Sequence, residues 1–381
     1  MSETALKPAS DIPAGAPDAN AVAHDAPKVE VQRTGACVSF VLNRPKALNA
    51  FDDEMRRVIA DEIPRISRNP DIYVVVLQSS SPRAFCAGGD VRALTREARD
   101  DRARVADSFA GEYRLNWLLD CFSKPTVSLI NGICMGSGAG LSLYNTHRVA
   151  GEAYSFAMPE TGIGLFPDVG VAHRLARLPW PLGLYLGLTG RAIGRGDAHW
   201  LGLATHCVDA VEYPRILQGF ADGEPIDPLL DERHRPQPVG PLQFERAMIE
   251  AFFSQPSLHL ILRALERATG ASAEWAQKTL ADLRKCSPIS LAITDRHIRF
   301  ARTLDLRETL IQDYRLAVGC LNGRDFYEGV RAALVDKDGK PAWSPASIED
   351  ISEAFIAAYF EPPGAGDLIL PTRREMQTSR V

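Results

Sequence analysis

Apolar runs and charged segments follow one another along the chain from about residue 29 to about residue 210. YVVVLQSS (73–80) and TVSLING (126–132) are continuous apolar runs, as expected of strands buried on both faces. A charged segment over roughly 91–120 separates them and predicts a helix. Strands and helices in alternation predict an α/β core with helices packed on a mostly parallel sheet.

Local signals at the start of this core predict a hairpin and a helix. VEVQRTGACVSFVLNRP predicts two strands joined at Thr34-Gly35. NAFDDEMRRVIADEIPRI predicts a helix, with Asn49 as its N-cap and acidic residues in its first turn.

After about residue 210 only helical periodicities remain, such as Leu306, Leu310, Tyr314 and Ala317. The segment 223–241 carries five prolines and predicts a connector. We therefore expect three regions: a disordered N-terminal tail over 1–28, an α/β core over 29–222 and a helical C-terminal region over 223–381.

Composition and residue patterns limit which partners, metal sites and cellular locations we expect. The net charge of −5 argues against a nucleic-acid partner. The seven cysteines include no CxxC pair and the eight histidines no HExxH, so we expect a reduced compartment and no metal site. The first 27 residues lack an apolar signal core and contain four acidic residues and no Arg, which predicts a cytoplasmic location. Although 125–144 resembles a membrane span, its Gly and Ser content favours a strand, loop and helix over membrane insertion.

Two glycine-rich loops follow predicted strands. In AFCAGGD (84–90) and NGICMGSGAGL (131–141), small residues stand where a helix begins, so backbone N–H groups can face a ligand. Each loop could equally be a tight turn. The second lacks the GxGxxG, GxSxG and GKS/GKT patterns of a full dinucleotide fingerprint, a nucleophile elbow or a P-loop. Two such loops side by side predict an oxyanion hole.

MPETGIGLFPDVG (158–170) places Glu160 and Asp168 among Gly, Pro and apolar residues. A carboxylate in such surroundings has a raised pKa unless it is paired, which is how general acids and bases are tuned. The structural alternative is a pair of capping or turn carboxylates.

FCAGGD, INGICMGSGAGL and PETGIG together resemble the enoyl-CoA hydratase/isomerase (crotonase) superfamily over about 30–210. MPETGIGLFPDVG, KCSPISLAIT and DFYEGVRAALVDKDGKPAWSP are similar to its 3-hydroxyisobutyryl-CoA hydrolase branch. The resemblance implies a crotonase-like ββα spiral as the catalytic core, with a helical C-terminal region.

The resemblance also implies roles for residues. Glu160 and Asp168 are the implied catalytic pair, and Glu112 of EYRLN lies near the acyl group. Of the two glutamates that a hydratase uses, the one in the glycine-rich loop aligns with Gly140 and is therefore missing, and the other aligns with Glu160. The thioester oxygen is expected between the N–H groups of Ala87 and Ser137; further substrate contacts are expected at Gly88, Asp90, Gly136 and Ala47.

The implied activity is hydrolysis of a short 3-hydroxyacyl-CoA thioester in valine degradation, most simply 3-hydroxyisobutyryl-CoA. Coenzyme A is then part of the substrate, no cofactor is needed, and a homo-oligomer is compatible. An enoyl-CoA hydratase or isomerase and a non-catalytic CoA-binding protein remain as alternatives. Arg44, Lys46 and Arg92 are candidates for the CoA phosphates, or else solvated charges, and Cys86 is expected to be a small buried side chain.

Overall fold

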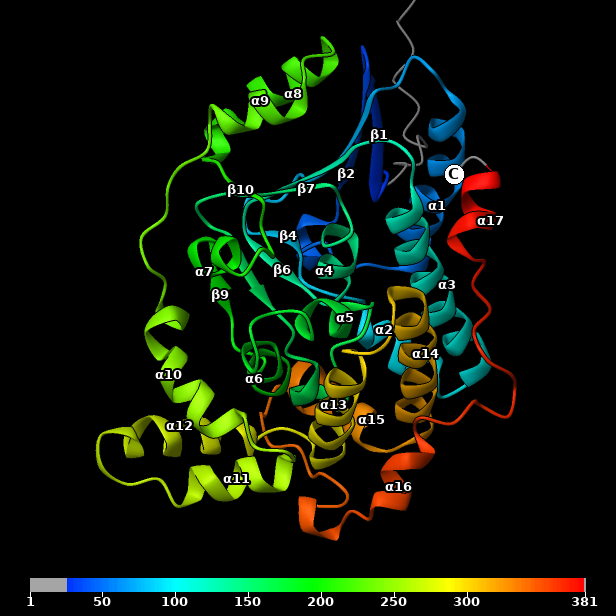
Figure 1. The fold of residues 1–381 in the computed structure, drawn as a ribbon. Helices are drawn as coiled ribbons and strands as arrows, with labels where there is room; N and C mark the ends of the chain where they lie inside the picture. The colour runs from blue at the N-terminus through cyan, green and yellow to red at the C-terminus, as the bar shows by residue number, and fades with distance from the viewer. Residues whose placement is uncertain (1–25, 380–381) are drawn as a thin grey trace, which may run out of the picture.

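The computed structural model describes residues 26–379 (Figure 1). The N-terminal tail predicted over 1–28 therefore lies outside the described residues up to position 25. Its last residue, Lys28, forms ion pairs with Asp52 at 2.8 Å and with Glu54 at 2.6 Å. These contacts attach the end of the tail to the start of the first helix.

The described strands form two sheets. The larger has the order β1 (Val29–Thr34), β2 (Cys37–Leu42), β3 (Val74–Ser79), β5 (Thr126–Ile130), β7 (His147–Ala150) and β10 (His206–Cys207). The smaller has the order β4 (Ala84–Cys86), β6 (Ile133–Met135), β8 (Ser155–Ala157) and β9 (Ile193–Gly194). Neighbouring strands are parallel except β1 with β2 and β8 with β9. The predicted hairpin and the two predicted buried strands, β3 and β5, are thus confirmed.

Consecutive strands are divided between the two sheets. β3, β5 and β7 lie in the larger sheet, and the strand that follows each of them, β4, β6 or β8, lies in the smaller one. A helix or a 3₁₀ turn follows each pair, so the chain winds as a ββα spiral. Because β4, β6 and β8 are parallel neighbours, their carboxyl ends meet at one edge of the smaller sheet. This edge carries the candidate site.

The helices of the spiral are α1 (Asp53–Arg68), α2 (Val91–Glu97), α3 (Arg102–Cys121), α4 (Ser137–Ser142), α5 (Val171–Leu175), α6 (Leu182–Thr189), α7 (Arg195–Trp200) and α8 (Tyr213–Ala221). The predicted helix over 91–120 is thus two helices, and the Asp101 side chain caps the second by accepting from the Arg104 N–H. The segment 125–144 forms β5, β6 and α4, so the expected strand, loop and helix are confirmed.

The N-cap prediction at Asn49 is wrong. Helix α1 begins at Asp53, and its N-cap is Asp52, whose carboxylate accepts from the N–H groups of Glu54 and Met55. Asn49 is instead fully buried with φ of 55°. Its side-chain amide donates to Ser79 Oγ at 2.7 Å, which ties the loop to the sheet. Asparagine is one of the few residues that adopt this left-handed conformation readily.

Within the described residues, the chain after β10 contains helices and no strand. They are α9 (Ile226–Asp231), α10 (Pro241–Phe253), α11 (Leu258–Glu266), α12 (Ala273–Leu283), α13 (Pro288–Phe300), α14 (Leu306–Asn322), α15 (Asp325–Val330), α16 (Glu353–Ala358) and α17 (Arg373–Thr378). Helix α9 forms inside the segment expected to be a connector, and its Ile226 and Leu230 pack on the larger sheet. Helices α14 and α17 lie along α3 (Figure 1), and one buried cluster joins Phe85 of the spiral to Phe326 of α15. The C-terminal helices therefore share a core with the spiral.

Candidate active site

A cavity of about 210 Å³ opens at the carboxyl ends of β4, β6 and β8. It brings together seven of the nine residues predicted for the site: Ala87, Gly88, Glu112, Gly136, Ser137, Glu160 and Asp168. Much of the remaining lining is apolar, contributed by Val91, Leu94, Phe109, Met135, Ile163, Leu165 and Leu334. The cavity can therefore hold a short aliphatic chain beside a few polar groups.

Glu160 follows Pro159 and begins a 3₁₀ turn three residues after the last residue of β8. Its side chain is buried, and its Oε2 atom has no hydrogen-bond partner among the described residues. Burial raises the pKa of this carboxyl to about 8. A buried carboxyl that has one oxygen without a partner and a pKa near neutrality is suited to act as a base or nucleophile.

Asp168 also lines the cavity and accepts a hydrogen bond of 2.8 Å from the Tyr113 hydroxyl. Burial raises its pKa well above the usual range, and the nearby carboxyls of Glu112 and Glu160 raise it further. Three carboxyls in one small cavity do not all ionise together at neutral pH. The site can thus hold a proton on one carboxyl while another is charged. Tyr113 was not predicted, although it stands next to Glu112 in the sequence.

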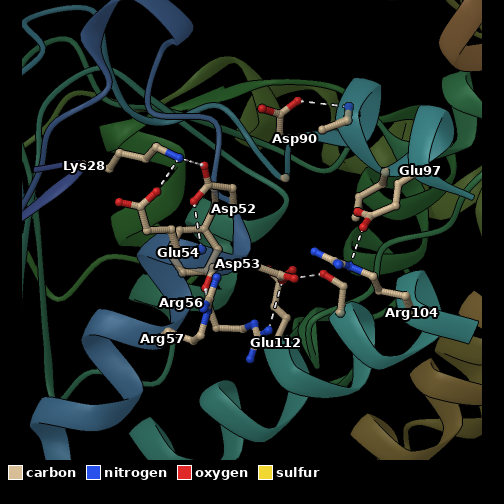
Figure 2. Close-up of a pocket in the computed structure, with 15 residues that line it drawn as sticks. Lys28, Asp52, Asp53, Glu54, Arg56, Arg57, Asp90, Glu97, Arg104 and Glu112 are labelled. Carbon is tan, nitrogen blue, oxygen red and sulfur yellow. Dashed lines mark hydrogen bonds and ion pairs between the residues drawn. The ribbon is translucent and has the colours of Figure 1, made fainter. Parts of the chain in front are cut away.

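Glu112 of α3 lines both this cavity and a second pocket of about 250 Å³, and Figure 2 shows it among the side chains of the second pocket. This second pocket is charged and includes Lys28, Asp53 and Arg56. Burial raises the pKa of Glu112, while the Ser137 hydroxyl and the Arg56 guanidinium act in the opposite direction. One carboxylate oxygen, Oε1, has no hydrogen-bond partner among the described residues. Glu112 can therefore receive a polar group of a ligand.

The predicted N–H donor Ala87 is wrong. Its N–H group donates to the Leu48 carbonyl at 3.0 Å, because the loop after β2 runs beside the loop after β4. Gly89 is better placed, since its N–H has no acceptor among the described residues. A Cβ atom on Gly89 would lie 3.2 Å from Ser137 Oγ, so the two residues face each other. The pattern AGG could have suggested any of its three N–H groups.

Ser137 is the first residue of α4, and a helix offers no acceptor to its first N–H groups. Its position in the cavity wall opposite Gly89 is compatible with the second predicted donor. The neighbouring Gly136 is an approach point to Glu160, because a Cβ there would lie 3.0 Å from Glu160 Oε1. Gly89 and Ser137 together can present two N–H donors to one oxygen.

Gly140 is enclosed. A Cβ atom there would lie 2.8 Å from Asn116 Nδ2 and 2.8 Å from Val169 Cβ. No larger side chain fits at this position without displacing its neighbours. The second carboxylate of a hydratase therefore has neither a residue nor space here.

The structure does not place the last two predicted contacts in the cavity. Asp90 lines the charged pocket, caps α2 through the Ala93 N–H and pairs with Arg44 at 3.1 Å. Ala47 is exposed on the loop that passes Ala87, so its role stays a prediction. Arg44 also pairs with Asp52 at 3.2 Å, which gives it a structural role.

Three further observations bear on the sequence predictions. The Cys86 thiol is buried, and burial raises its pKa, as expected of an unreactive side chain. Across residues 26–379, no group of three or more His, Cys, Asp or Glu side chains is arranged to hold a metal ion. No helix in the same range has the length and apolar composition needed to cross a membrane.

This chain is similar in sequence to a known family and to several known enzymes. The family model for enoyl-CoA hydratase/isomerase matches residues 37–360. 3-Hydroxyisobutyryl-CoA hydrolase, mitochondrial, of Xenopus tropicalis is 39% identical over 89% of this chain and 90% of that protein. 3-Hydroxyisobutyryl-CoA hydrolase 1 of Arabidopsis thaliana is 37% identical over 92% of this chain and 96% of that protein.

Two solved structures share the fold closely. A carnitinyl-CoA dehydratase from Mycobacterium thermoresistibile has a TM-score of 0.84 at 33% identity and covers 90% of this chain and 98% of its own. An enoyl-CoA hydratase from Rhodobacter sphaeroides has a TM-score of 0.84 at 34% identity and covers 90% of this chain and 100% of its own. The predicted crotonase fold is therefore confirmed, and the chain belongs to the enoyl-CoA hydratase/isomerase family.

Proposed function

We propose that this protein hydrolyses a short 3-hydroxyacyl-CoA thioester, and that 3-hydroxyisobutyryl-CoA is its substrate. One observation carries the proposal: Glu160 and Asp168 share a cavity with two backbone donors, while the position of a hydratase's second glutamate is a walled-in glycine, Gly140. The relatives named 3-hydroxyisobutyryl-CoA hydrolase cover nearly the whole chain and support the substrate.

In the proposed reaction, the thioester carbonyl oxygen accepts from the N–H groups of Gly89 and Ser137. Negative charge develops on this oxygen as the carbonyl carbon is attacked, so these donors stabilise the transition state more than the substrate. The acyl chain lies against the apolar wall of the cavity. Glu112 accepts from the substrate's 3-hydroxyl group.

Glu160 acts in its ionised form in one of two ways. It attacks the carbonyl carbon, so that a C–O bond forms, the C–S bond breaks and water then hydrolyses the resulting anhydride. Alternatively, it takes a proton from water while the hydroxide adds to the carbonyl carbon. In both routes coenzyme A leaves as the thiol after the sulfur takes up a proton. Asp168 and its Tyr113 partner orient and polarise the reacting groups.

Particular residues disfavour two alternatives to hydrolysis. Solved structures of a hydratase and a dehydratase share the fold, which keeps hydration under consideration, but the enclosure of Gly140 disfavours it. A non-catalytic CoA-binding protein would not need buried carboxyls with raised pKa values in its cavity.

We further propose that the reaction uses no metal or redox cofactor, because the carboxyls and N–H donors supply the acid, base and oxyanion chemistry. A role in valine degradation, a cytoplasmic location and a homo-oligomer stay predictions. The vertebrate relatives carry the word mitochondrial in their names, which concerns those proteins.

Release of free thiol from 3-hydroxyisobutyryl-CoA tests the proposal. Wild type should release one thiol per molecule of acid formed. Glu160→Gln keeps size but removes the charge, so its rate should be at least ~10³-fold lower while CoA esters still bind. Near-normal turnover by Glu160→Gln would remove Glu160 from the mechanism, and no release by wild type would refute the proposed function.

A further inference from the structure

The turn that carries Asp168 has an unusual backbone. Val169 has φ of 51° and Gly170 has φ of 74°, so two consecutive residues are left-handed. This conformation suits glycine but strains a β-branched residue such as valine. Strained backbone at a candidate site persists only where the surrounding structure holds it.

Three side chains hold this turn, and each comes from a different part of the chain. The Tyr113 hydroxyl of α3 donates to Asp168 Oδ2 at 2.8 Å. The Tyr144 hydroxyl, just after α4, donates to the Val169 carbonyl at 2.5 Å. The Gly170 N–H donates to Asp313 Oδ2 of α14 at 2.6 Å.

Asp313 is the contribution of the C-terminal helices. It is fully buried, and its second oxygen lies 2.6 Å from His297 Nε2 of α13. His297 is buried as well, and its Nδ1 atom has no hydrogen-bond partner among the described residues. An ionised carboxylate oxygen can only accept, so we assign Nε2 as the donor in this contact. Asp313 thus accepts from two N–H groups.

The cost of this arrangement points to a purpose. A buried carboxylate is expensive even when it is hydrogen-bonded, and an apolar residue would pack α14 against the spiral at lower cost. The His297 ring stands edge-on to Phe166, at 5.8 Å between centroids. Because Phe166 lies two residues before Asp168, His297 and Asp313 both contact the segment that carries this carboxyl. Asp313 therefore acts on the turn in addition to filling the helix interface.

We propose that Asp313, oriented by His297 and assisted by Tyr144, is a positioning residue that holds the 168–170 turn so that the Asp168 carboxyl stays in the cavity that Glu160 also lines. The inference rests on the proposed hydrolysis, in which Asp168 acts beside Glu160. The C-terminal helices then belong to the catalytic apparatus as well as to the core.

Substitutions at position 313 separate positioning from general packing. Asp313→Leu removes both acceptors, so kcat should fall about 10²-fold while KM changes less than about 3-fold, as expected when a reacting group is misplaced. Asp313→Asn should keep kcat within about 5-fold of wild type, because its oxygen can accept from Gly170 while its amide donates to the other tautomer of His297. Tyr144→Phe should lower kcat about 5-fold through loss of one hydrogen bond.

Asp295→Leu is the matched control. Asp295 is another buried aspartate of the C-terminal helices, but it pairs with Arg299 at 2.8 Å on the same helix and does not contact the turn. It should lose stability without a comparable loss of kcat. Equal losses in the Asp313→Leu and Asp295→Leu variants would reduce the effect to general loosening and overturn the proposal, as would a folded Asp313→Leu enzyme with wild-type kcat.

Amide hydrogen exchange tests, without relying on activity, whether Asp313 and Tyr144 hold the 168–170 turn. Exchange of the peptide over 166–172 should rise in Asp313→Leu and Tyr144→Phe and stay unchanged in Asp295→Leu. If Asp313→Leu does not fold, Tyr144→Phe tests the proposal instead. Unchanged exchange and unchanged kcat in that variant would overturn it. Failure of the wild type to hydrolyse 3-hydroxyisobutyryl-CoA would refute the proposed function alone, since the exchange result stands apart from it.

Discussion

The raised pKa of Glu160 predicts that the folded protein is less stable at alkaline pH than it would be with a neutral side chain at this position. Burial raises this pKa from 4.5 to about 8, which corresponds to about 5 kcal/mol against the ionised form in the folded state. As the pH rises from about 4.5 to about 8, the unfolded chain loses this proton while the folded chain keeps it. The free energy of unfolding therefore falls over this window.

Glu160→Gln removes the penalty because glutamine is neutral at every pH. Its stability gain over wild type should be near zero at pH 4.5 and grow to at most about 5 kcal/mol above pH 8. At an order of 2 °C per kcal/mol for a chain of this size, the upper limit is about 10 °C in Tm.

Thermal unfolding of both proteins at pH 5 and pH 8.5 measures this difference directly. Glu274→Gln, at an exposed position of α12, is the control and should show no such trend. The wild-type kcat/KM should also rise with pH toward a midpoint near 8, because only the ionised Glu160 can act. A Tm difference that is independent of pH would refute the reasoning, because Glu160 would then not be a buried, protonated group in the folded protein.

Three further predictions follow from the cavity wall. Ser137→Ala should keep most of its activity, since the backbone N–H and not the hydroxyl is the proposed donor; steady-state hydrolysis checks this. Gly140→Glu should lose about 1–3 kcal/mol or more of stability by overpacking against Asn116 and Val169, measured by denaturant unfolding, and should gain no crotonyl-CoA hydration. Leu334→Ala should enlarge the cavity, so that kcat/KM for longer 3-hydroxyacyl-CoA esters rises relative to the four-carbon ester.

Each of these can fail clearly. A loss of several orders of magnitude in a folded Ser137→Ala variant would indicate a serine nucleophile. Hydration by Gly140→Glu would show that the position is open after all. An unchanged chain-length preference in Leu334→Ala would place the acyl chain elsewhere.

Local sequence signals predicted the pieces that are set by strand ends. Glu160, Ser137 and the AGG loop each lie within three residues of a strand end, and parallel neighbours bring these ends to one edge. Which N–H group of AGG faces the cavity could not be predicted, because the Ala87 donor is taken by the Leu48 carbonyl from a loop distant in sequence. Asn49 misled for a similar reason, since its buried amide serves the sheet and not the helix start.

Residues that reach the site from distant parts of the chain could not be predicted from local sequence patterns. Asp313 lies in a regular helical repeat, and only the packing of α14 on the spiral brings it to Gly170. Leu334 looks like one more apolar position of the C-terminal region, yet it lines the cavity. Such contacts depend on how two regions dock, which neither periodicity nor spacing encodes.

The central claim is tested most directly by giving the wild-type enzyme two substrates side by side and following both thiol release and hydration. Because Gly140 stands where a hydratase carries one of its two glutamates, we expect release of coenzyme A from 3-hydroxyisobutyryl-CoA and barely detectable hydration of crotonyl-CoA. Hydration of crotonyl-CoA that is faster than hydrolysis of any 3-hydroxyacyl-CoA would contradict the assignment of this cavity to thioester hydrolysis.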